Sequence, residues 1–276
     1  MILSDLHTHS TFSTDGRSEL TDMIQTAKLR GLRYYGVSEH FDLDDYSIRL
    51  YGSIDVKAYF ECARSLQQQC SGDNFTFLAG GEFNYVSDRS VLGKFNSVVD
   101  TYHPDYVVNS VHVVDGIECF RREYFDGKTQ HYAFSRYLDQ VLESLDAPYH
   151  YDIVGHLGYV ARNAPYEHRK IAYVDYADLY DEILTKIIRK NVILEVNSSA
   201  RGAESEFLPD TDVLARYFQL GGRKISFGSD AHNIDRIADK RDLVCKALRT
   251  IGFTHITVPC KGKHIQISLD TTSNDV

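Results

Sequence analysis

Histidine and carboxylate side chains in this sequence have the spacing of metal ligands. The chain has 12 histidines, and His7 and His9 form a His-x-His pair. Asp230 and His232 repeat the same spacing near the other end of the chain. Side chains two residues apart in a strand point to the same side, so each pair can present two ligand atoms together. Nitrogen and oxygen ligands of this kind suit zinc, manganese or iron.

Further candidate ligands come directly after short apolar runs, where a strand would end. With Asp15 they complete a set of nine: His7, His9, Asp15, His40, Glu82, His112, His156, Asp230 and His232. Nine ligands are more than one ion uses. With three or four ligands per ion and one bridging carboxylate, they would hold three divalent ions (Zn, Mn or Fe). Paired ions act on phosphate esters because they bind both the attacking and the leaving oxygen.

Apolar runs alternate with helical segments, which predicts the elements that position these ligands. Seven apolar runs lie near residues 2–3, 34–38, 75–79, 106–111, 153–155, 192–197 and 225–228. Helical periodicity is found at 20–30, 56–69, 130–145, 176–189, 213–220 and 241–251. This alternation favours a parallel sheet. Because functional side chains of a βα barrel gather at the carboxyl ends of its strands, we expect an α/β fold, a distorted TIM-like (β/α)7 barrel, with the ligands around its mouth.

Composition and charge exclude several classes of protein. The chain has 276 residues, of which 43% are hydrophobic and 25% charged, as in globular proteins. We expect a single domain over 1–270 and a C-terminal tail at 271–276. A net charge of −9 without a basic patch argues against nucleic acid as a partner. The sequence contains no run of about 18 apolar residues, so we expect no membrane-spanning segment.

The cysteines and the start of the sequence bear on location. Five cysteines occur without a CxxC motif, which is typical of free thiols in a reducing compartment. The first residues lack the basic and apolar regions of a signal peptide. We therefore expect a cytoplasmic protein. Its oligomeric state is unknown from the sequence.

The order of the motifs resembles the PHP (polymerase and histidinol phosphatase) superfamily. The resemblance covers residues 1–255 and rests on separated segments in the same order, from the His-x-His pair to the Asp-x-His pair. The segments "STDGRSEL", "SEH" and "GHLGYVARN" resemble those of stand-alone histidinol-phosphate phosphatases. The resemblance implies a distorted (β/α)7 barrel with a trinuclear metal site at its carboxyl-terminal mouth.

The resemblance also implies which residues share an ion. The first ion corresponds to His7, His9, Glu82 and Asp230. Glu82 bridges to a second ion, which is also bound by His112 and His156. The third corresponds to Asp15, His40 and His232. Several relatives have histidine where this chain has Asp15, and the additional oxygen ligand favours Mn²⁺ or Fe²⁺ over Zn²⁺ at that position.

Two arginines and two polar residues are candidate substrate contacts. Arg162 and Arg201 follow barrel strands on the ligand side, and a guanidinium group matches phosphate oxygens in pairs. Asn197 and Ser229 lie at strand ends and are further candidates for substrate binding. The expected catalytic residues are Glu82, Asp230, Arg162 and Arg201.

The resemblance implies hydrolysis of L-histidinol phosphate to L-histidinol and phosphate, by attack of a metal-bridging hydroxide. The expected partner is therefore a small phosphorylated metabolite. Asp42, Asp44 and Glu118 are candidates to receive its amine and imidazole, and the insert between Val113 and Leu145 is a candidate lid. The alternatives are a superfamily phosphoesterase for a nucleotide, a sugar phosphate or a protein phosphotyrosine, and a non-catalytic metal-binding module. The complete ligand set favours an enzyme.

Overall fold

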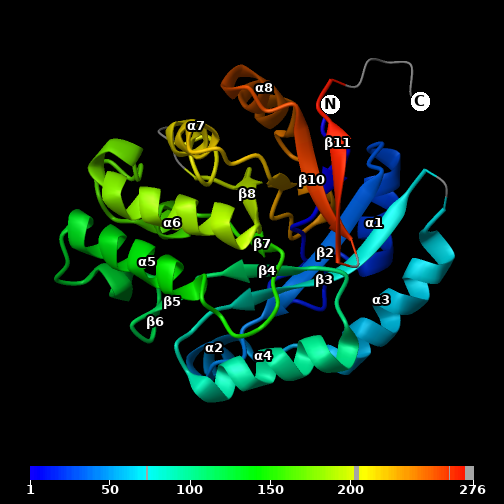
Figure 1. Cartoon of the computed structure of the whole chain (residues 1–276). Helices are drawn as coiled ribbons and strands as arrows, with labels where there is room; N and C mark the ends of the chain where they lie inside the picture. The colour runs from blue at the N-terminus through cyan, green and yellow to red at the C-terminus, as the bar shows by residue number, and fades with distance from the viewer. Residues whose placement is uncertain (73, 202–204, 261, 271–276) are drawn as a thin grey trace.

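The computed structural model describes residues 1–72, 74–201, 205–260 and 262–270. Seven parallel strands form one sheet in the order β1-β2-β3-β4-β7-β8-β9. Their bounds are Ser4–Asp5, Tyr34–Phe41, Thr76–Asn84, Val107–Ser110, Ile153–Val154, Ile193–Asn197 and Ile225–Gly228. Figure 1 shows the helices arranged outside these strands. The tail expected at 271–276 lies outside the described residues.

The first and last strands meet and bring the sheet round into a barrel. The backbone N–H of Leu6 donates to Phe227 O at 3.1 Å, and the N–H of Asp230 donates to His7 O at 2.7 Å. A parallel bridge also joins Thr8 to Ala231. The nearly closed (β/α)7 barrel expected from the sequence is therefore confirmed, and the two ligand pairs lie on adjacent strands.

The helices pack an apolar face on the barrel. They are α1 to α8, with bounds Leu20–Leu29, Asp45–Tyr51, Val56–Cys70, Arg89–Tyr102, Gln130–Ser144, Ala177–Lys190, Thr211–Gln219 and Arg241–Ile251. In α6, for example, Tyr180, Ile183, Leu184 and Ile187 are buried, as the spacing of an amphipathic helix requires. Six of the eight were predicted within one or two residues of their bounds.

Two helices and two hairpins were not predicted from the sequence. Helix α4 begins after Asp88, whose side chain accepts from the N–H groups of Ser90 and Val91, and such a cap is a local signal that the periodicity did not reveal. The other missed helix is α2. The hairpins are β5–β6 (Val113–Val114 and Ile117–Glu118) and β10–β11 (His255–Cys260 and Lys263–Ser268). Short 3-10 helices cover Arg122–Phe125, Tyr159–Asn163, Tyr173–Asp175 and Ile234–Arg236.

A tyrosine fills the barrel below the mouth. The side chain of Tyr106 lies against Gly36 and Gly80, where added Cβ atoms would come within 2.4 Å of its hydroxyl oxygen and 2.5 Å of its ring, respectively. Its hydroxyl donates to Leu6 O at 2.7 Å. Because side chains fill the barrel interior, the polar residues above Tyr106 lie at the closed end of a cavity and not at the entrance of a channel.

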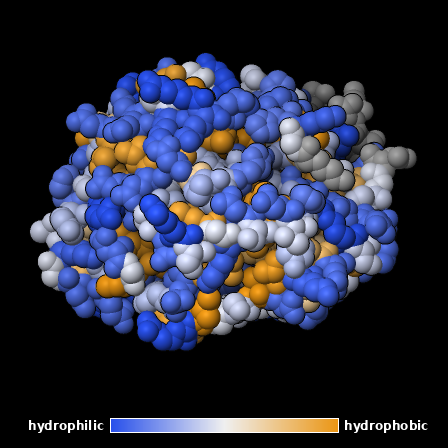
Figure 2. Space-filling view, turned by 60° about the horizontal axis from the view of Figure 1, so that its bottom comes forward, coloured by the Kyte–Doolittle hydropathy of each residue, from blue (hydrophilic) through white to orange (hydrophobic). Residues whose placement is uncertain are grey.

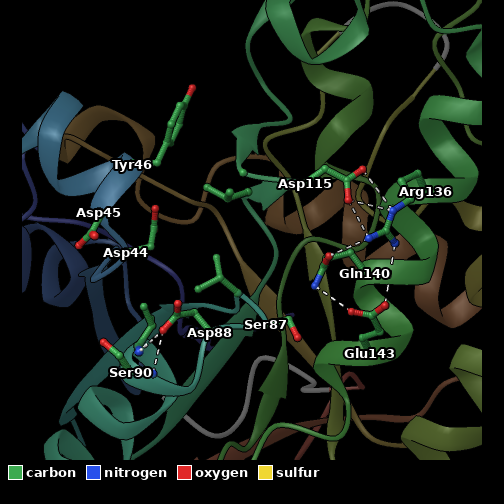
Figure 3. A pocket seen from close by; sticks show the side chains of 14 residues that line it. Asp44, Asp45, Tyr46, Ser87, Asp88, Ser90, Asp115, Arg136, Gln140 and Glu143 are labelled. Atoms are coloured by element: carbon green, nitrogen blue, oxygen red, sulfur yellow. Dashed lines mark hydrogen bonds and ion pairs between the residues drawn. The ribbon is translucent and has the colours of Figure 1, made fainter.

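The insert between Val113 and Leu145 consists of hairpin β5–β6, a 3-10 helix and α5. Figure 3 shows Arg136 of α5 reaching the hairpin turn, where it pairs with Asp115. An ion pair thus joins the hairpin to α5.

The outer surface is mainly polar. Figure 2 shows hydrophilic residues with scattered apolar ones on the face it presents. Among the described residues, none of the helices has the length and hydrophobicity needed to cross a membrane. In the described part of the chain, the cysteines form no disulfide bond.

Candidate active site

Glu82, on β3, lies at the centre of a ring of histidines. Its Oε1 is 2.7 Å from His156 Nε2 and 3.2 Å from the Nε2 atoms of both His112 and His7. Its Oε2 is 2.8 Å from His40 Nδ1. These four histidines come from or follow different strands, and Glu82 itself is fully buried. One carboxylate therefore contacts all of them, as the bridging role expected for Glu82 requires.

The remaining ligands lie on the β9 and β1 side of the ring. His9 Nε2 is 3.4 Å from Asp230 Oδ1, and its ring stacks on those of His40 and His232 at 4.0 and 4.4 Å. Asp15 is 3.0 Å from His232 Nε2 and 3.6 Å from His40 Nε2. The structure thus brings all nine predicted ligands together at the mouth.

Four groups of three ligands have donor atoms within 4.8 Å of one another. They are His9–His40–His232, His7–His9–Asp230, His7–Glu82–His156 and His40–Glu82–His112. The buried Nε2 atoms of His7 and His9 make no hydrogen bond, and the contact of Glu82 Oε2 with His40 Nδ1 lacks hydrogen-bond geometry. A buried polar atom without a partner costs about 1–3 kcal/mol, so this cluster is suited to cations that would bind these atoms.

The electrostatics of the cluster favour ionised carboxylates. Burial opposes the charge on Glu82, but His7, His112 and His40 hold the pKa of its carboxyl well below the usual value. Burial also opposes the charge on Asp230, and Arg162 and His7 lower its pKa well below the usual value. Both side chains are therefore in the form that binds metal ions.

Burial and the neighbouring charges of His40 and His232 lower the pKa of His9 well below that of an ordinary histidine. His9 is therefore neutral, as a metal ligand must be.

Asp230 has a strained backbone and is joined to the predicted phosphate-binding arginine. Its φ of 54° lies in the left-handed region, which is unfavourable for a residue with a side chain. The side chain contacts the guanidinium of Arg162, which also contacts the Ser199 hydroxyl. Arg162 is 7% exposed, and its guanidinium lies 4.8 Å from the centre of the Tyr159 ring. Arg162 is therefore held at the edge of the ligand cluster.

The other three predicted substrate contacts differ in their exposure to the central cavity. Arg201 is exposed and lies over the Phe120 ring at 5.2 Å, on the wall of the central cavity. Asn197 is buried, and its Oδ1 accepts from Ser199 and, at 3.4 Å, from Arg162. Ser229 donates its hydroxyl to Asp5 at 2.6 Å and is fully buried.

Asn197 and Ser229 are not among the residues that line the cavity. Their contact with substrate stays a prediction. Asn197 accepts from Arg162, while Ser229 donates to Asp5 and so joins β9 to β1.

A cavity of about 600 Å³ opens above the ligand cluster. Its cationic residues follow β7, β8, β9 and β1, and they are Arg17, Arg162, Arg201, Arg236 and Lys240. On the arc from β2 to β4, the walls carry Asp42, Tyr51, Glu118 and Phe120. Asp15, Asp230 and Asp239 line the same side, where Asp230 contacts Arg162 and Asp239 contacts Arg236. The cavity therefore has one side with an excess of cationic side chains and another with carboxylates and aromatic rings.

Two of the three predicted loop carboxylates face this cavity. Asp42 contacts His112 Nδ1 at 3.2 Å, and Glu118 is held by Tyr51 and Arg121. Asp44 instead lines a separate hollow of about 520 Å³, which Figure 3 shows beside α2 and α5. Asp44 caps α2 by accepting from Ser47 N, and it is therefore a structural residue.

Glu195, on β8, was not predicted as a site residue. Its Oε1 is 2.7 Å from His7 Nδ1, and its Oε2 accepts from His156 N at 2.6 Å. The signal available in the sequence was a carboxylate inside the apolar strand "ILEVN". A charged residue there needs a buried partner, although the sequence does not show which one.

Comparisons with known proteins agree with this geometry. A family model described as PHP domain matches residues 5–199. The "Probable histidinol-phosphatase" of Clostridium acetobutylicum is 27% identical over 233 residues, which cover 84% of this chain and 88% of the relative. The "Histidinol-phosphatase" of Lactococcus lactis is 29% identical over 248 residues, which cover 88% of this chain and 90% of the relative.

A solved structure is also similar over almost the whole chain. It is the histidinol phosphate phosphatase of Lactococcus lactis, crystallised with zinc, L-histidinol and phosphate. The two structures superpose with a TM-score of 0.85 at 26% sequence identity, covering 95% of this chain and 98% of the other.

Proposed function

Because this chain belongs to the PHP domain family, we propose that it is a metal-dependent phosphomonoesterase that hydrolyses L-histidinol phosphate to L-histidinol and phosphate, a reaction of histidine biosynthesis. The observation that carries the proposal is the cluster of nine candidate ligands, most of them buried, beneath a cavity with five cationic side chains on one side and carboxylates and aromatic rings on the other. The names of the two relatives and the ligands of the Lactococcus lactis structure support it.

The ligand cluster is proposed to hold three divalent ions of Zn, Mn or Fe. The first would be held by His7, His9, Glu82 and Asp230, and the second by Glu82, His112 and His156. The third would be held by Asp15, His40 and His232. When bound, such ions lower the pKa of water toward neutrality and offset the charge of a phosphate group.

The basic side of the cavity would bind the phosphate group. Arg162 is fixed by Asp230 and Ser199, so its guanidinium is preorganised to donate to phosphate oxygens. Arg201, which is more exposed, would donate from the cavity wall. Donors that stay in place as negative charge develops stabilise the transition state more than donors that must reorganise.

Asp230 is proposed to act as an ionised carboxylate throughout. Its pKa lies well below the usual value, because the nearby charges of Arg162 and His7 outweigh the effect of burial. It can therefore hold a cation, but it does not supply a proton to the leaving group at neutral pH.

The opposite side of the cavity would receive the cationic end of the substrate. Asp42 and Glu118 offer carboxylates to an ammonium or imidazolium group, and the rings of Phe120 and Tyr159 offer apolar surface to an imidazole. This arrangement suits a substrate with an anion at one end and a cation at the other. A cytoplasmic location fits such a biosynthetic enzyme, and neither nucleic acid nor membrane is a proposed partner.

Steady-state kinetics on a panel of phosphate esters would test the proposal. The panel contains histidinol phosphate, a nucleoside monophosphate, a sugar phosphate, phosphotyrosine and a phosphodiester, each assayed with Mn²⁺ and with Zn²⁺. We expect the highest kcat/KM for histidinol phosphate. A higher value for another ester would assign the site to that substrate, and no hydrolysis with any ester would leave a metal-binding protein without this activity.

A further inference from the structure

Glu195 is a buried carboxylate that is not among the nine proposed metal ligands. It is 1% exposed and lies on β8, inside the barrel and below the ligand cluster. Three donors surround it: His7 Nδ1 at 2.7 Å, the backbone N of His156 at 2.6 Å, and Asn197 Nδ2 at 3.2 Å. A carboxylate accepts hydrogen bonds and donates none. His7 therefore carries a proton on Nδ1, and its Nε2 lies on the side of the metal cluster.

The space for Glu195 exists because residue 228 is glycine. A Cβ at Gly228 would lie 2.1 Å from Glu195 Oε1 and 2.5 Å from His7 Cβ. Since no side chain fits there, β9 passes close to both residues and encloses their hydrogen bond.

The contacts of Glu195 continue to the phosphate-binding side. Asn197 donates to Glu195, and its own carbonyl oxygen accepts from Ser199 and Arg162. One carboxylate thus connects a candidate ligand of the first ion, the backbone of a candidate ligand of the second, and the residues that hold Arg162.

We propose that Glu195 is a positioning residue: through its contact with His7 Nδ1, in the space left by Gly228, it fixes the tautomer and orientation in which His7 presents Nε2 to a metal ion. The inference rests on the proposed metal binding. Carboxylates that orient metal-binding histidines typically contribute about 10–100-fold to metal affinity.

The variant Glu195→Gln tests this role with little change of shape. A glutamine has one accepting oxygen and one donating amide group, so it cannot accept from both His7 and His156 through separate oxygens. If its amide group faces His7, the imidazole must accept at Nδ1 and carry its proton on Nε2. That nitrogen then cannot bind a metal ion.

Asp105→Asn is the matched control. Asp105 is also buried and also accepts from three donors, on Arg64, Gln67 and Ala79, but it lies at the amino end of β4. The control therefore reports the effect of losing a buried carboxylate away from the ligand cluster.

Zn²⁺ affinity and bound zinc per chain would be measured for the full-length protein by competition with a chelating dye. We expect Glu195→Gln to weaken at least one zinc site by about 10–100-fold, and Asp105→Asn to leave zinc affinity unchanged. Both variants should lose thermal stability. Wild-type zinc affinity in Glu195→Gln, or an equal loss in both variants, would overturn the role of Glu195.

A measurement on the zinc-loaded wild-type protein covers the case in which Glu195→Gln does not fold. The ¹⁵N spectrum of the histidine rings should show His7 protonated at Nδ1 and not at Nε2. The opposite tautomer would overturn the inference. If the wild-type protein bound no zinc and also hydrolysed no ester, the proposed function would fail, whereas zinc binding by wild type with unchanged Glu195→Gln would reject this inference alone.

Discussion

Asp105 and Glu82 are buried carboxylates at opposite ends of the barrel, and their surroundings differ. At the amino end, Asp105 accepts from Arg64, Gln67 and the backbone of Ala79 at 2.7–2.9 Å. At the carboxyl end, Glu82 lies among four histidines, and its Oε2 makes no hydrogen bond. Among the residues that the structure describes, no buried polar side-chain atom of Asp105, Arg64 or Gln67 lacks a hydrogen bond, whereas the Glu82 cluster keeps unpaired atoms that added cations would bind. This difference separates a structural polar network from a binding site.

Metal removal should have the largest effect on activity, because it acts at the Glu82 end of the barrel and not at Asp105. We expect chelator-treated protein to lose phosphatase activity and to recover it with Mn²⁺, Zn²⁺ or Fe²⁺, because bound divalent ions are proposed to supply the attacking hydroxide. Activity and metal content would be measured on the same samples. Full activity with less than about one ion per chain would contradict a metal-dependent reaction.

The two buried carboxylates should differ strongly on substitution. Glu82→Gln is expected to lower kcat by about 10³-fold or more, since Glu82 is proposed to contact two ions. Asp105→Asn is expected to leave kcat unchanged and to lower the free energy of unfolding by about 1–3 kcal/mol. Kinetics and thermal unfolding on both variants would check this. Similar losses of kcat would mean that the two ends do not differ as proposed.

The arginines on the basic side of the cavity should also differ from each other. Arg162→Ala is expected to lower kcat/KM by about 10²-fold, or roughly 2.7 kcal/mol, because a fixed buried donor is lost. Arg201→Ala, at an exposed position, should cost about tenfold. Metal content should stay at the wild-type level in both. A larger loss for Arg201→Ala would reverse the assignment of the principal phosphate contact.

Zinc binding should strengthen as pH rises. Although burial opposes protonation, Glu82 and Asp42 raise the pKa of His112 to about 10. The metal-free protein therefore holds this proton at pH 6 to 9, and Zn²⁺ must displace it. Affinity should increase by about tenfold per pH unit for each displaced proton. The zinc-induced rise in Tm should thus be larger at pH 8 than at pH 6, and a smaller rise at pH 8 would show that no proton is displaced.

The sequence predicted the elements best where the local pattern is strong. Periodic helices such as α6 and α8 match their predicted ranges because each buries an apolar face. Helix α4 was missed even though Val91, Phe95 and Val98 are buried on one face. The short hairpin β5–β6 has only two residues in each strand, which is too few for a visible alternation.

The sequence itself indicated eight of the nine candidate ligands, because strand ends and His-x-His or Asp-x-His spacing are local properties and a βα barrel collects strand ends at one mouth. Asp15 lies in the loop between β1 and α1, outside these patterns. The tertiary structure alone decided the partners of the buried polar groups. His7 and Glu195 are 188 residues apart, and Ser229 faces Asp5 across the barrel closure. These contacts depend on which strands become neighbours and on the space that a glycine leaves. A local sequence pattern shows neither of them.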